Sequence, residues 1–140
     1  MPQSQLAVKP LNLKREINMA NITNPVTICV EAIEKHMEGV TASSEMPQTR
    51  DTSMPYVQVS RTGGGDTEFL DTPIMTLFCW SDTDSKAYML AENVKNVIAD
   101  EALDHPYLSA SSLISLARDE WAGDGRARYM LQLQLTINKL

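Results

Sequence analysis

Residues 127–137 alternate apolar and polar side chains, and this alternation limits the folds open to the chain more than any other feature. The apolar set is Tyr129, Leu131, Leu133, Leu135 and Ile137, and the set between them is Met130, Gln132, Gln134 and Thr136. A period of two residues is typical of a β-strand with one face on a core. The second set carries no charge, which fits equally a plain solvent-facing surface and a surface that another protein covers.

Three further segments have the composition of strands, at residues 56–60, 68–80 and 113–121. In residues 68–80 both alternating sets are apolar: Ile74, Phe78 and Trp80 on one side, and Met75, Leu77 and Cys79 on the other. A strand of this kind needs a cover on both faces. A small domain has helices for one face, so we expect a neighbouring subunit to cover the other.

Two helices are predicted from their caps and apolar stripes. Asn24-Pro25 fits the N-cap and first position of a helix of about 14 residues that stops at Gly39. Residues 81–84, Ser-Asp-Thr-Asp, are suited to cap a second helix, whose apolar residues recur every three or four positions. His105-Pro106 ends that helix, because the residue before a proline disfavours helical dihedral angles.

The resulting order, α-β-β-α-β-β, predicts an α+β domain over residues 23–140, with a mostly antiparallel four-stranded sheet and two helices packed on it. Residues 41–55 are rich in Ser, Thr and Pro and are expected to be a loop with a contact role. Residues 1–22 are polar and lack a period, which predicts an arm that is disordered until a partner fixes it. Met1 and Met19 are both compatible with a translation start.

Composition and charge argue against several functions. The chain of 140 residues is 43% hydrophobic, enough for one core, and its apolar runs fall short of the roughly 20 residues that a membrane-spanning helix needs. It lacks the pattern of a signal peptide, so we expect a soluble protein. A formal net charge of −6 opposes sequence-independent binding to nucleic acid, which depends on Lys and Arg neutralising phosphates.

The stretch VSRTGGGDT, residues 59–67, raises the question of phosphate binding, because glycines after a strand can cradle an anion. A phosphate loop also needs a Lys-Ser/Thr pair and the start of a helix, and neither follows here. Asp66 and Glu68 would instead repel a phosphate. We therefore interpret residues 61–72 as a long connection between two strands, in which glycine permits a positive φ.

Catalytic and metal-binding patterns are weak in this sequence. His36 and His105 stand near a predicted helix end and a proline turn, where structural roles are expected. The acidic pair at residues 119–120 would point to opposite faces of a strand and could not share a proton. Cys29 and Cys79 lie in apolar segments and are interpreted as buried hydrophobes, with a disulfide as the less favoured alternative. No enzyme activity, cofactor or metal is predicted.

Five short motifs occur in order within residues 55–140: Arg-Thr-Gly-Gly at 61–64, Asp-Thr-Pro at 71–73, Trp-Ser at 80–81, Ala-x-x-Leu-Ala at 87–91 and Arg-Tyr at 128–129. Their order and spacing resemble those of the tail terminator proteins of long non-contractile-tailed bacteriophages, over about 85 of the 140 residues. The third glycine, Gly65, and the long N-terminal segment depart from the pattern, which leaves the role of that segment open.

The resemblance implies an α+β subunit that forms a ring, a hexamer, on the head-proximal end of the tail tube. Such a ring ends polymerisation of the tail tube protein, presents a surface to the head-tail connector and neck proteins, and lets genome DNA pass through its bore without specific binding. It implies a place in the virion neck after assembly in the host cytoplasm. Loop position and resemblance together select the contact residues Arg61, Thr62, Gly63, Gly64, Gly65, Asp66, Glu68, Phe69, Asp71, Arg126 and Arg128.

Two other functions stay open at this point. One is another neck, connector or tail-completion protein, which would attach to the connector instead of the tube. The other is a small ligand-binding or enzymatic α+β domain that uses the loop at Gly63–Gly65.

Overall fold

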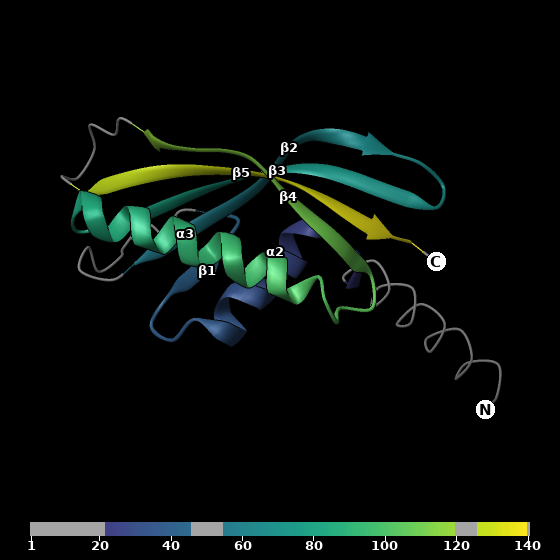
Figure 1. The fold of residues 1–140 in the computed structure, drawn as a ribbon, viewed down its shortest axis with the longest axis horizontal. Helices are drawn as coiled ribbons and strands as arrows, with labels where there is room; N and C mark the ends of the chain where they lie inside the picture. Colours follow the sequence, from purple (N-terminus) through teal and green to yellow (C-terminus); the bar gives the residue numbers. More distant parts are fainter. Residues whose placement is uncertain (1–21, 46–54, 120–125, 140) are drawn as a thin grey trace, which may run out of the picture.

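The computed structural model describes residues 22–45, 55–119 and 126–139, in which two helices lie on one side of a five-stranded sheet (Figure 1). Along the chain the elements are α2 (Pro25–His36), β1 (Thr41–Ser43), β2 (Tyr56–Asp66), β3 (Leu70–Ser81), α3 (Asp84–Glu101), β4 (Leu108–Asp119) and β5 (Ala127–Asn138). Across the sheet the strands follow the order β1-β2-β3-β5-β4. Neighbouring strands are antiparallel, except that β1 and β2 are parallel.

The predicted α+β class and the mostly antiparallel sheet are confirmed, but the sheet has five strands instead of four, so the predicted element order lacks one strand. Residues 41–43, which the composition assigns to a loop, form β1 and pair with Tyr56–Gln58 of β2. Ala42 of β1 is buried, and its N–H donates to Glu34 Oε2 at 3.4 Å. Three residues are too few to show a period, so contacts with β2 and α2 decide that this segment is extended.

Strand β4 begins at Leu108, before the predicted segment 113–121. Its first residues, Leu-Ser-Ala-Ser-Ser, have weak strand propensity, and pairing with β5 holds them extended. Residues 120 and 121 and the predicted turn at 123–125 lie outside the described residues. The predicted N-terminal arm, apart from Ile22, lies outside them as well.

Both helices begin at the predicted caps. Asn24 Oδ1 accepts hydrogen bonds from the N–H groups of the second and third residues after it, at 2.9 and 3.3 Å, and Pro25 begins α2. Thr83 Oγ1 accepts from the N–H of Lys86 at 3.2 Å and caps α3. Helix α2 is shorter than predicted, because it ends before Gly39, whose φ of 79° reverses the chain toward β1.

The core lies between the two helices and one face of the sheet. The predicted alternation in β5 is confirmed, since its fully buried residues are Leu131, Leu133, Leu135 and Ile137. Ala91, Val94 and Ile98 of α3 belong to the same core. Burying one Leu or Ile side chain contributes about 1.5–3 kcal/mol, so β5 anchors the fold.

Strand β3 has buried residues on both of its faces, as its sequence predicts. Met75, Leu77 and Cys79 belong to the core under the helices. On the other face Phe78 is half-buried and Trp80 is only 1% exposed. Side chains of the same chain lie over Trp80, where the sequence led us to expect a neighbouring subunit.

Candidate functional site

The predicted long connection at residues 61–72 is wrong, because nearly all of it is strand. β2 continues to Asp66 and β3 begins at Leu70, so the turn consists of the three residues between them. Thr67 closes this turn: its N–H donates to the carbonyl of Leu70 at 2.7 Å, and its Oγ1 accepts from the N–H of Leu70 at 3.0 Å. Figure 1 shows the resulting β2–β3 hairpin projecting beyond the helices.

One glycine of this hairpin, Gly64, permits a close approach of the two strands. The register of β2 against β3 shifts between Arg61 and Gly63, which marks a β-bulge. Gly64 follows with a φ of 98°, and a Cβ placed there would lie 2.2 Å from the carbonyl oxygen of Thr72. Only glycine fits both the dihedral angle and the space. Packing against β3 therefore explains this glycine, without a bound phosphate.

Arg61 is exposed, but its guanidinium group makes its contacts within the hairpin. Its Nη1 lies 2.9 Å from Asp71 Oδ2, and its Nε donates to the carbonyl of Gly63 at 3.1 Å. Asp71 is buried. Thr62 is similarly engaged, since its Oγ1 lies 2.8 Å from Thr76 Oγ1. These two predicted contact residues are both exposed, and their side chains brace the hairpin through hydrogen bonds within it.

The tip of the hairpin presents apolar side chains. Phe69 is 53% exposed and Leu70 is also exposed, while Glu68 beside them is exposed and acidic. The C-terminal end of the chain supports the tip, because the N–H of Lys139 donates to the carbonyl of Phe69 at 2.9 Å and its Nζ forms an ion pair with Asp66. We call residues 66–70 the hairpin tip.

The two predicted arginines lie at the opposite end of the β3–β5 pair. Arg128 is in register with Trp80, whereas the partner of Asn138 is Leu70, next to the hairpin tip. Ten residues of strand separate these positions, about 33 Å. The structure therefore does not bring the eleven predicted contact residues together: nine lie along the β2–β3 hairpin, and Arg126 and Arg128 lie at the opposite end of the β3–β5 pair.

The arginine end is a packed cluster. The guanidinium carbon of Arg128 lies 4.4 Å from the ring centre of Phe78 and 5.5 Å from that of Trp80, and Arg128 forms an ion pair with Asp119. Arg126 is buried, with its guanidinium carbon 5.9 Å from the Trp80 ring. We call these five residues the arginine cluster. Cation–π contacts of this kind contribute about 0.5–2 kcal/mol each.

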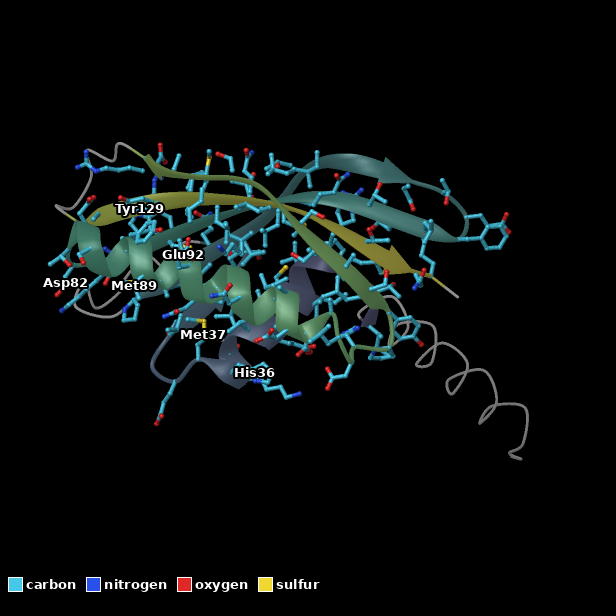
Figure 2. All side chains as sticks on the ribbon, in the orientation of Figure 1. His36, Met37, Asp82, Met89, Glu92 and Tyr129 are labelled. Atoms are coloured by element: carbon cyan, nitrogen blue, oxygen red, sulfur yellow. The ribbon has the colours of Figure 1, made fainter. Side chains whose placement is uncertain are left out.

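A groove of about 670 Å³ lies between the end of α2 and one side of α3, and no sequence pattern predicted it. Figure 2 shows His36 and Met37 at the end of α2 and Met89 on α3 at this groove. Met89 is exposed although it is apolar. In the sequence, Met89 stands beside the predicted buried stripe of α3. That position does not reveal that α2 forms the other side of the groove.

The two histidines make contacts within the fold. His36 Nε2 lies 3.2 Å from Glu101 Oε1 at the protein surface. His105 Nδ1 accepts hydrogen bonds from the N–H groups of Tyr107 and Leu108, both at 3.0 Å, and so holds the turn that leads into β4. These contacts agree with the structural roles predicted for them.

The cysteines are free and buried, as the favoured interpretation has it. Burial raises the pKa of both thiols, Cys29 and Cys79, to about 12, which keeps them protonated at neutral pH. Loss of solvation, followed by the Asp84 carboxylate, raises the pKa of Tyr129. Of the predicted acidic pair, Asp119 belongs to the arginine cluster, and residue 120 lies outside the described residues.

Among the residues that the structure describes, no three His, Cys, Asp or Glu side chains gather as a metal site. No helix in the same ranges has the length and apolar character to cross a membrane. No protein-family model matches this chain, and no curated protein matches it. A function is therefore argued from the two ends of the sheet, the groove and the sequence resemblance.

Proposed function

We propose that this protein is a ring-forming phage tail subunit that caps the head-proximal end of the tail tube. The observation that carries the proposal is the division of the predicted contact residues between two unlike ends of the β3–β5 pair. The resemblance of residues 55–140 to tail terminator proteins supplies the biological setting. A tube cap needs two unlike faces, and the subunit offers one at each end of its longest strands.

The hairpin tip is the end that we assign to the tail tube. Its exposed Phe69 and Leu70 would be buried against the last ring of tube subunits. The bonds of Lys139 to the tip keep it in place before binding, which lowers the entropic cost of association. A braced ribbon can thus act as a plug that fits the tube end.

The arginine end is assigned to the head-tail connector. Among the described residues at this end, the cationic group of Arg128 is engaged with the Phe78 ring and with Asp119, in contrast to the apolar side chains of the hairpin tip. If the arginine end cannot bind a further ring of tube protein, elongation stops there. Specificity of this kind comes from a surface that disfavours the wrong partner. Tube growth would therefore end once the cap has bound.

Ring closure would explain why subunits stop adding to one another laterally. Head-to-tail contacts between copies close into a ring when the rotation between them divides a full turn. The resemblance implies six copies. The net charge of −6 per subunit would let DNA slide through the bore without adhering, because like charges repel the phosphates.

The test is a capping assay with purified tail tubes and unpolymerised tube protein. We expect the wild-type protein to bind one tube end in negative-stain images and to block elongation. Phe69→Ser should abolish both effects, whereas the matched control Leu103→Ser, at a residue that is 84% exposed just after α3, should keep them. Failure of the wild-type protein to bind tube ends would refute the proposal, and binding to the connector alone would identify another neck protein.

The groove between α2 and α3 favours a second candidate, a ligand-binding domain. Its volume of about 670 Å³ lies within the usual range of small-molecule sites, and Met37, Met89 and Leu90 give it an apolar wall. The glycine stretch does not support this function, because Gly64 is packed against β3. Thermal-shift screening against nucleotides and metabolites tests the candidate, with Met89→Trp as the variant that fills the groove.

A further inference from the structure

Strand β4 forms an edge of the sheet. It is last in the strand order, and among the described residues no strand pairs with its outer side. The backbone N–H and C=O groups along such an edge are a template for pairing with another chain. At 12 residues β4 is long for an edge strand.

The β4 edge has two register shifts but lacks the charged residues and prolines that usually protect edge strands. From Leu108 to Ala117 it contains no charged residue and no proline. Leu113 and Ile114 are 51% and 48% exposed. The register against β5 shifts around Ser109 and Ile114, but the residues between these two positions keep regular pairing. An apolar, uncharged edge of this kind is suited to a partner strand.

Within the described residues, the opposite side of the sheet has a second edge without a partner strand, and its character differs from that of β4. β1 pairs only with the first three residues of β2, Tyr56–Gln58. Beyond them Val59–Asp66 has no further strand on that side within the described ranges. The charges of this stretch are neutralised within the hairpin, Arg61 by Asp71 and Asp66 by Lys139.

The two edges are complementary in shape and in direction. Gly63–Gly65 leave a strip of β2 without side chains, which gives room to the bulky Leu113 and Ile114. Three successive antiparallel pairings, β2 with β3, β3 with β5 and β5 with β4, make β4 antiparallel to β2. A second copy in the same orientation would therefore place its β2 antiparallel to β4, as an ordinary ladder requires.

We propose that the outer edge of β4, residues 108–117, pairs with Val59–Asp66 of β2 in a second copy of this chain. This inference rests on the proposed function, because it names the joint that closes the ring. A β4-to-β2 joint uses two different edges and therefore repeats head to tail, whereas a joint between two β4 edges would stop at a dimer. The other exposed faces remain available to the tube and the connector.

Disulfide trapping tests the joint directly. Cysteines at Leu113 and Gly65 are compatible with the single subunit, since Leu113 is exposed and a Cβ at Gly65 makes only an ordinary 3.6 Å contact. The native Cys29 and Cys79 are buried and will not compete. Under mild oxidation we expect the double variant Leu113→Cys/Gly65→Cys to give a series of disulfide-linked oligomers. The double variant Leu113→Cys/Gly63→Cys tests the neighbouring register in the same way. Each single variant should remain unlinked.

A charge variant tests the same edge without crosslinking. Ile114→Lys should raise the concentration needed for ring assembly by about tenfold or more, because a lysine on an edge strand must be desolvated to pair. Leu103→Lys, at an exposed leucine outside both strands, is the matched control and should leave assembly unchanged. Hydrogen exchange should slow on assembly in residues 109–117 and 59–66, but not in the central strand β5.

The outcomes separate this joint from the proposed function. Rings that cap tubes but give no linked oligomers with either cysteine pair, or rings that Ile114→Lys leaves intact, would overturn the joint and leave the cap in place. Linked dimers from Leu113→Cys alone would show pairing between two β4 edges and also overturn it. A protein that stays monomeric beside tail tubes would refute the cap and the joint together.

Discussion

The two ends of β3 have the same neighbours, β2 and β5, yet opposite environments. At one end Trp80 is almost fully buried under aromatic and arginine side chains. At the other end the hairpin tip exposes Phe69. The helices cover the other face of the sheet at the Trp80 end, because α3 starts directly after β3, whereas the hairpin extends past them (Figure 1). One continuous strand can thus serve as core at one end and as contact surface at the other.

The largest expected effect lies at the buried end. Trp80→Ala should lower the free energy of unfolding by about 3–5 kcal/mol, because it leaves a cavity and removes the ring on which Arg126 and Arg128 stack. Urea unfolding followed by circular dichroism measures this. A loss below about 1 kcal/mol would mean that the arginine end is not a packed cluster.

The glycines of the hairpin should give the next largest effect. Gly64→Ala places a Cβ against the backbone of Thr72 at a positive φ, so we expect a loss of about 1–3 kcal/mol in unfolding free energy. Gly65→Ala is the matched control, since its Cβ would meet only Thr72 Oγ1 at 3.6 Å. Equal losses in the two variants would contradict a specific role for Gly64.

The buried end should also show a pH dependence that the hairpin end lacks. The pKa of Cys79 is raised from 9.0 to about 12 in the folded protein, so the unfolded chain loses this proton first as pH rises. The stability that this thiol contributes below pH 9 is therefore lost between pH 9 and about 12, with about 1 kcal/mol lost by pH 10. Urea unfolding of the wild type and of Cys79→Ala at pH 8 and pH 10 measures the difference.

A cysteine at the hairpin end provides the control for that measurement. Gly65→Cys adds an exposed thiol, which titrates alike in the folded and unfolded chain and should add no pH dependence. If Cys79→Ala lost as much stability between pH 8 and pH 10 as the wild type, burial of this thiol would not explain the alkaline loss.

The smallest effect on stability is expected at the hairpin tip. Phe69→Ala should change the free energy of unfolding by less than about 0.5 kcal/mol, because the ring is more than half exposed. The same variant should lose tube capping. We therefore expect Phe69→Ala to keep its stability and lose its function. Capping at the wild-type level would remove the tip from the proposed contact.

Local signals in the sequence predicted much of the fold. The side chain of Asn24 caps α2, Thr83 caps α3, and the alternating residues of β5 are buried as predicted. Each of these features depends on a few residues close together in the chain. Such signals are readable because a cap or a strand face is decided by the spacing of the side chains themselves.

Features that depend on a distant partner were missed or misread. β1 forms because β2 lies beside it, and the three glycines look like a loop until β3 is placed against Gly64. The groove needs α2 and α3 together. The candidate contact residues were predicted as one set, and only the register of β3 with β5 separates Arg128 from the hairpin tip.

By itself the sequence determined the α+β class, both helix starts and the buried face of β5, because these follow from periodicity and capping chemistry within short windows. Tertiary structure alone decided that β2 runs through its glycines, that the arginines and the hairpin tip occupy opposite ends, and that β4 and β2 have unlike edges without a partner strand among the described residues. The reason is that strand pairing joins residues far apart in the chain, and no local pattern encodes which backbone lies alongside which.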